Sequence, residues 1–294
     1  MSIELVDATA IPSGAAIAWR RLAGNPEAVS GLVLLGALFL LAFLGPYLTR
    51  WHYADIDFTS FSEPPSADHW FGTTRDGKDV YALTLRGMRR SLVIGLLVAV
   101  VATGAAAVAG TCAGYFGGWA DRLLMWPADL LLVLPMFLLV AIMSPLLRVE
   151  NWLMFAISLA ALLWMITARM VRNMTISLKE REYVLAARYM GVPPMVIICR
   201  HIVPGLGSLL IVDAAMNVSA AVIAETGLSY LGFGVQPPDS SLGTVIADGA
   251  AAAAGYPWMF YFAAGLLVLI VLGVNLVGDG LRDALDPAVR HGRG

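Results

Sequence analysis

The chain has 294 residues, of which 59% are hydrophobic and only 14% are charged, and its formal net charge is −2. A soluble domain typically carries about 25% charged residues, so this composition predicts an integral membrane protein rather than a soluble one. A net charge this close to zero gives no reason to expect nucleic acid as a partner.

The N-terminal part predicts one membrane span between two polar segments. Residues 1–28 are polar to mixed, with Arg20 and Arg21 just before an uncharged run at 29–49. That run is about as long as a helix needs to cross the hydrocarbon core, and longer than the apolar region of a secretory signal. Residues 50–90 then form a polar segment rich in aromatic residues, proline and glycine.

Residues 91–278 predict a core of five further helices, followed by a charged tail at 279–294. The third span of the chain contains three prolines, which neighbouring helices in a bundle can accommodate. The five spans are expected at 91–112, 123–147, 152–168, 206–231 and 257–277. The fold class predicted is therefore an all-α membrane protein with six transmembrane helices and both termini on one side.

Three glycines spaced four residues apart follow the second span. Gly110, Gly114 and Gly118 form a small-xxx-small pattern, which lets helix backbones approach closely. In a glycine-rich turn the same spacing indicates only a bend. Both interpretations stay open from the sequence.

A polar stretch within the loop at 173–205 separates the fourth and fifth spans. Residues 179–191 predict a short helix that Gly191 ends, and Pro193-Pro194 predict the start of a second helix that Pro204 closes. A plain connection needs only a few residues, so this longer hairpin predicts a docking surface. Acidic residues are interleaved with its arginines, which favours a protein partner over a phosphate or lipid headgroup.

The hairpin resembles a known motif. Ala186-Ala187, then Gly191, then His201-Ile202-Val203-Pro204 resemble the EAA loop of ABC-importer permeases. The segments GYFGGWADRLLMWPADLLLVLP, ETGLSYLGFGVQPP and NLVGDGLRDALDP resemble, in the same order, the C-type permeases of dipeptide, oligopeptide and nickel importers. The likeness runs roughly from Gly72 to Pro287. Leu185 replaces the glutamate of the motif, one helical turn after Glu182, and Val203 replaces its usual leucine.

The resemblance implies a type I ABC-importer permease fold and a non-catalytic subunit that moves short peptides, nickel being the family's minority substrate. It implies a homologous permease partner in a heterodimer, two ATPase subunits or one fused ATPase, and an extracytoplasmic solute-binding protein. ATP and Mg would be bound by the ATPases, because this chain has no phosphate-binding loop. The residues expected to couple to the ATPase are Arg181, Glu182, Ala186, Ala187, Arg188, Gly191, His201 and Pro204.

Charge distribution predicts the orientation in the cytoplasmic (inner) membrane. Twelve of the nineteen lysines and arginines fall in the tails, the 113–122 turn and the stretch from Arg169 to the end of the hairpin, which places these segments and both termini in the cytoplasm. The segments 50–90 and 232–256 are then extracytoplasmic and would receive the binding protein. Arg86, Arg89 and Arg90 run against this bias, but acidic residues share their segment.

Several polar residues fall inside apolar spans. Asp129 lies in the third span, and Asp213, Asn217 and Glu225 recur at multiples of four residues along the fifth, which makes one polar stripe. Ionisable groups at membrane depth usually face a bundle interior or an aqueous cavity. The stripe therefore lines a hydrated path for the substrate, or it holds the helices together through hydrogen bonds.

Two alternatives belong to other functional classes. An ion-coupled secondary transporter without ATPase subunits would use Asp213 and Glu225 as ion sites, but such carriers often show inverted repeats and none is evident here. A membrane enzyme or scaffold is the other alternative, and no catalytic constellation supports it. The four histidines and the two cysteines, Cys112 and Cys199, form no metal-ligand cluster, so no metal site is predicted.

Overall fold

The computed structural model describes residues 20–143, 152–236 and 239–285, and in these ranges the regular secondary structure is helical. Five of the helices described are each long and apolar enough to cross a membrane. They are α2 (Pro26–Leu44), which continues into the short η1 (Gly45–Tyr47), α3 (Val80–Phe116), α6 (Trp152–Leu178), α10 (Gly207–Tyr230) and α12 (Trp258–Leu285).

The predicted third span, 123–147, is a broken one. It consists of α4 (Gly118–Val133) and α5 (Met136–Met143), which are bent by 95° at the break. Pro135 causes the break, because proline disfavours helical backbone in the residue before it, and Leu134 is extended with ψ 138°. Pro127 stays within α4, whereas Pro145 lies outside the described residues.

The helix ends differ from the predicted ones mostly where charged residues lie in the end turns. α3 begins at Val80 rather than at 91, because the Asp79 side chain caps it by accepting a hydrogen bond from the Ala82 N–H at 2.7 Å. The predicted polar segment 50–90 therefore ends in a helix. α6 and α12 likewise continue past 168 and 277, through Arg169 and Asp279. α10 agrees with the predicted 206–231 to within one residue at each end.

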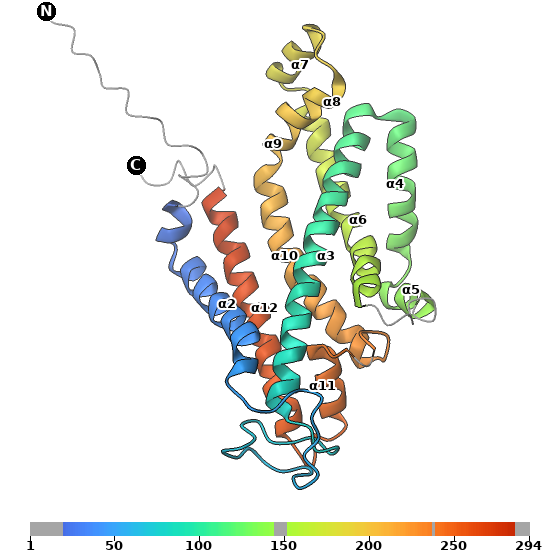
Figure 1. Cartoon of the computed structure of the whole chain (residues 1–294). Helices are drawn as coiled ribbons and strands as arrows, with labels where there is room; N and C mark the ends of the chain where they lie inside the picture. Colours follow the sequence, from blue (N-terminus) through green and yellow to red (C-terminus); the bar gives the residue numbers. More distant parts are fainter. Residues whose placement is uncertain (1–19, 144–151, 237–238, 286–294) are drawn as a thin grey trace, which may run out of the picture.

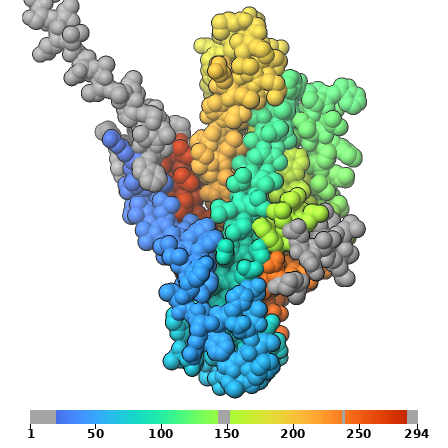
Figure 2. All heavy atoms as spheres, viewed as in Figure 1, coloured from blue at the N-terminus to red at the C-terminus, as the bar shows by residue number. Residues whose placement is uncertain are grey.

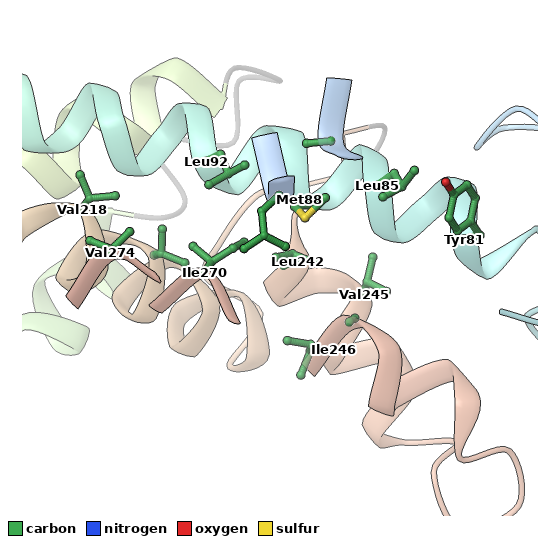
Figure 3. Close-up of a cluster of buried hydrophobic side chains, with 14 of the residues drawn as sticks. Tyr81, Leu85, Met88, Leu92, Val218, Leu242, Val245, Ile246, Ile270 and Val274 are labelled. Atoms are coloured by element: carbon green, nitrogen blue, oxygen red, sulfur yellow. The ribbon is translucent and has the colours of Figure 1, made fainter. Parts of the chain in front are cut away.

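α3 is the central helix of the bundle, with α6 along one side and α10 and the α2–α12 pair along others (Figure 1). Its residues Tyr81, Leu85, Met88 and Leu92 follow a helical spacing and point into a core shared with α10, α11 (Leu242–Ala250) and α12 (Figure 3). These four side chains are at most 4% exposed. Burial of this stripe fixes the first third of α3 within the bundle.

The three spaced glycines divide between the two interpretations left open above. A Cβ at Gly110 would lie 2.6 Å from the Ala168 carbonyl oxygen, and one at Gly114 would lie 2.7 Å from that of Arg172. These two glycines therefore allow α3 and α6 to pack backbone against backbone. Gly118 has open space around it and a φ of +54°, so it serves the turn into α4.

The bundle has two distinct ends (Figure 1). The hairpin, residues 181–205, projects beyond the other helices at one end, where α2 begins and α12 finishes (Figure 2). A mostly non-helical segment, residues 48–79, lies at the opposite end beside α11 and is called the cap here. The cap packs onto the start of α12, where the Trp258 Nε1–H donates to the Thr73 carbonyl at 3.3 Å.

Candidate functional site

The hairpin is built from α7 (Glu182–Tyr189) and a second helical run made of α8 (Pro194–Ile197), η2 (Ile198–Ile202) and α9 (Val203–Gly205). Pro193-Pro194 starts the second run, as predicted. Pro204 does not close it, because the backbone stays helical up to α10. Pro204 has no N–H to donate, and the preceding turn widens into a π-helix, in which the Val203 N–H bonds to the Ile198 carbonyl.

Gly191 sets the angle between the two arms of the hairpin. It ends α7 with a φ of +77°, a conformation that a residue with a Cβ adopts only with strain. Its N–H bonds to the Arg188 carbonyl, and the Val192 N–H bonds to the Ala187 carbonyl, both at 3.1 Å. This pattern is the Schellman motif, so the requirement for glycine at this position is conformational.

The hairpin rests on an apolar cluster, called the seat here. Its buried members are Val171, Val184, Ala187, Ile197, Ile198, Ile202 and Leu206, and each is at most 3% exposed. Tyr115 from α3 and Leu178 from α6 pack against this cluster. The Lys179 Nζ also donates to the Gly114 carbonyl at 3.1 Å. The seat thus joins the hairpin to the ends of α3 and α6 and to the start of α10.

The residues predicted to couple to an ATPase do not share one face. Ala187 is 3% exposed and belongs to the seat, and His201 is partly buried with its ring tilted against Tyr183. The exposed ones are Arg181, Glu182, Ala186, Arg188, Gly191 and Pro204. In α7, Val184 and Ala187 point inward at i and i+3, so the outward face carries the charges.

The same surface carries an apolar tip that was not predicted from the sequence. Tyr189 is 87% exposed, Met190 is 75% exposed and Met195 is 57% exposed. The helical spacing could have predicted this tip, because Tyr189 and Met190 lie between Ala187, the last inward residue of α7, and Gly191, where the chain turns. Large apolar side chains exposed together in this way mark a protein contact surface.

Asp213 accepts hydrogen bonds from three side chains on three helices. The Thr167 hydroxyl of α6 lies 2.9 Å away, the Thr103 hydroxyl of α3 3.2 Å away, and the Asn217 amide of α10 2.8 Å away. Asn217 also donates to Thr103 at 3.2 Å. The carboxylate therefore joins three helices, and it remains partly exposed.

Glu225 is fully buried at the other end of the stripe. Ser91 of α3 donates to one carboxylate oxygen at 3.0 Å, and Ser229 donates to the other at 2.7 Å. Ser91 in turn accepts the first N–H of α11, from Leu242, at 3.1 Å. These contacts are the ones that a role in helix packing requires. A role in the translocation path stays a prediction for Asp213, Asn217 and Glu225.

Asp129 lies on the open face of α4 and pairs with Arg169 of α6, whose Nε donates at 2.9 Å. Nearer the hairpin end, Asp121 pairs with Arg172 in the same way. These two pairs join α4 to α6 at the edge of the bundle.

The two segments predicted to receive a binding protein lie together at the cap end. Arg86 and Arg90 of α3 both pair with Asp239, which follows α10. The two arginines also lie over the rings of Tyr53 and Trp152, each 4.7 Å from the ring centre. These contacts attach the loop after α10 to the start of α3.

Within the cap, a buried histidine connects two carboxylates. The His69 Nδ1 lies 2.8 Å from Asp79 and its Nε2 lies 3.4 Å from Asp57. Trp51 stacks on the same ring. Hydrogen bonds from the side chain and backbone of Thr59 lower the pKa of Asp57 to about 2, so this carboxyl is ionised at neutral pH.

Comparison with known proteins gives a consistent picture. Residues 106–291 match the family model of the binding-protein-dependent transport system inner membrane component, and residues 15–65 match the N-terminal TM domain of oligopeptide transport permease C. The chain is 55% identical to the oligopeptide transport system permease protein OppC of Mycobacterium tuberculosis, over 92% of this chain and 94% of that one.

Relatives in another organism and a solved structure extend this likeness. The chain is 38% identical to the dipeptide transport system permease protein DppC of Bacillus subtilis, over 93% of this chain and 86% of that one. A solved structure of inward-facing conformations of the MetNI methionine ABC transporter covers 69% of this chain and 97% of its own, with a TM-score of 0.55. At 20% identity, this last likeness concerns the fold.

Proposed function

Since this chain belongs to the family of binding-protein-dependent transport system inner membrane components, we propose that it couples ATP hydrolysis on separate cytoplasmic subunits to the import of short peptides. The family makes it a multi-pass ABC-importer permease. The peptide substrate is proposed from the names of its relatives, which include oligopeptide and dipeptide permeases.

The observation that carries the coupling is the mounting of the hairpin. Its outward face presents Arg181, Glu182, Ala186, Arg188 and the apolar tip, while its inward face rests on the seat. A partner that moves this face displaces the ends of α3, α6 and α10 together, because the seat contacts all three. Such a contact biases a bundle with two conformations.

The proposed orientation places the hairpin and both termini in the cytoplasm, where ATPases bind ATP and Mg. It rests on the twelve of nineteen lysines and arginines that lie in the tails, the 113–122 turn and the stretch from Arg169 to the end of the hairpin, since cytoplasmic loops are enriched in these residues. The cap and the loop after α10 then face outward and receive a solute-binding protein. The broad apolar surface left exposed on this chain also suits a heterodimer with a homologous permease.

The test uses the complete transporter, expressed with its neighbouring subunits and purified in mild detergent. Ala186→Trp places a bulky ring on the outward face of α7 and is expected to abolish both co-purification of the ATPase and peptide uptake. The matched control is Ala251→Trp, at an exposed alanine of the cap end, which is expected to retain the ATPase. Peptide uptake by the chain without any ATPase would favour the ion-coupled carrier instead.

A further inference from the structure

An open groove runs between α4 and α6 at the hairpin end of the bundle. It has a volume of about 780 Å³, and its walls include Trp119, Arg122, Trp126, Asp129, Arg169 and Arg172. None of these residues belongs to the hairpin or to the polar stripe of α10. The groove is therefore separate from both surfaces discussed above.

The charges in this groove leave one cation unmatched. Arg169 pairs with Asp129, and Arg172 pairs with Asp121, so these four charges balance. Arg122 is exposed, and in the described part of the chain it makes no hydrogen bond or ion pair with any carboxylate. The groove thus has a net positive charge, which is complementary to an anion.

The groove continues into an exposed apolar stripe along α4. The stripe consists of Trp119, Leu123, Trp126, Leu130 and Val133, which are 50% to 84% exposed. Their spacing of four, three, four and three residues keeps them on one helix face. At a rise of about 1.5 Å per residue the stripe is about 21 Å long, which exceeds half of a hydrocarbon core of about 30 Å.

The two tryptophans and the arginines at one end of this stripe indicate the depth of the site. Tryptophan is enriched where the hydrocarbon core meets the headgroups, and basic pockets between transmembrane helices bind anionic lipid headgroups. The Asp129–Arg169 pair also indicates a polar ligand at this site. Its side chains are 56% and 48% exposed, and a charge pair open to hydrocarbon is costly unless polar groups cover it.

We propose that the α4–α6 groove binds an anionic phospholipid, with the phosphate beside Arg122 and the acyl chains along the apolar stripe of α4. The polar ester groups that join the phosphate to the acyl chains then lie toward the open Asp129–Arg169 pair, about two helical turns from Arg122 along α4. This site is additional to the proposed transport function, since it involves neither the hairpin nor the substrate.

The first test reconstitutes the complete transporter in nanodiscs containing equal amounts of phosphatidylglycerol and phosphatidylcholine and counts the retained lipids by native mass spectrometry. One arginine near an anionic lipid strengthens the binding of that lipid about fivefold. Arg122→Gln is therefore expected to lower the retention of phosphatidylglycerol by about that factor. Arg89→Gln is the matched control, because it removes an exposed arginine at the cap end. Equal retention by wild type and Arg122→Gln overturns the proposal.

The second test identifies the occupant directly. A photoreactive amino acid replaces Leu123, which lines the groove and is 74% exposed, and the transporter is irradiated in native membranes. Cross-links to phospholipid support the proposal, and cross-links to another permease subunit overturn it. Uptake of peptide need not change in either test, so failure here is distinguishable from failure of the proposed function.

Discussion

The cap end of the bundle and the hairpin at the opposite end are held by different forces. At the cap end, charged side chains are paired, both across the sequence, as in the contacts of Asp239 with Arg86 and Arg90, and within the cap, where His69 contacts Asp57 and Asp79. Beneath the hairpin, the seat is apolar, and the Lys179 side chain beside it donates to the Gly114 carbonyl. Directional bonds fix one geometry, whereas an apolar seat resists separation but tolerates small sliding. The hairpin is therefore the element suited to small movements against the bundle.

The largest expected effect comes from emptying part of the seat. Ile202→Ala removes a fully buried side chain and is expected to cost about 2–5 kcal/mol of local stability. Limited proteolysis of the hairpin and peptide uptake measure the loss. Ile211→Ala, at a side chain of α10 that is 51% exposed, is the control. Equal protease resistance of the two variants would show that the seat does not hold the hairpin.

A smaller effect is expected from the turn of the hairpin. Gly191→Ala places a Cβ at a φ of +77° and is expected to cost about 1–2 kcal/mol, with a matching decrease in coupling between ATPase activity and uptake. The same substitution at Gly207, which lies in a helix with open space around it, is expected to be neutral or stabilising. If the Gly191→Ala transporter still couples ATP hydrolysis to uptake, this position does not require the conformation that favours glycine.

At the cap end, Asp239→Asn leaves Arg86 and Arg90 without a carboxylate. Solvent partly screens both ion pairs, so the free energy of unfolding is expected to fall by about 1 kcal/mol. Hydrogen exchange in the loop after α10 is the measurement, and it should accelerate. Asp68→Asn is the control, because the Arg50–Asp68 pair is open to solvent and its loss should not be detectable.

The smallest effect is a pH dependence of the cap. The pKa of Asp57 is lowered to about 2 in the folded protein, below its unfolded value of about 4. Its stabilising contribution is therefore complete above about pH 4 and is lost as the pH falls toward about 2. Hydrogen exchange of the cap between about pH 5 and 2.5, corrected for intrinsic rates, reports the loss. Thr59→Ala should flatten this dependence, and an unchanged profile would show that Thr59 does not hold the carboxylate.

Local sequence signals predicted much of the fold. The uncharged runs predicted the five long helices and the broken pair of α4 and α5, and α10 falls almost where expected because an apolar run separates the hairpin from a cation-free loop. The start of α3 was predicted too late, because its first three turns contain Arg86, Arg89 and Arg90. The hydrogen bond from the Ala82 N–H to the Asp79 side chain shows that the helix begins at Val80. Pro204 was predicted to end the helical run, but the run continues because the π-helical turn before it accommodates a residue without an N–H donor.

The candidate site was less predictable than the fold, because side-chain orientation depends on long-range contacts. Ala187 is part of a motif expected at the surface, yet the seat buries it. Glu225 has two serine partners, Ser229 on its own helix and Ser91, which lies 134 residues away in the sequence. A stripe of polar residues on one helix shows that partners must exist, but it does not show whether those partners are other helices or water.

The unbroken length of α3 has a mechanical consequence. This helix runs from Val80 to Phe116, and Tyr115 near its end packs against the seat. A rise of about 1.5 Å per residue makes it a rod of about 55 Å. Gly95, near its middle, lies against Val218 and Val222 of α10, a crossing that can act as a fulcrum. A tilt of about 5° around that point displaces the two tips by about 2 Å in opposite directions. Opening on one side of the bilayer and closing on the other can thus be a single motion of one rigid part.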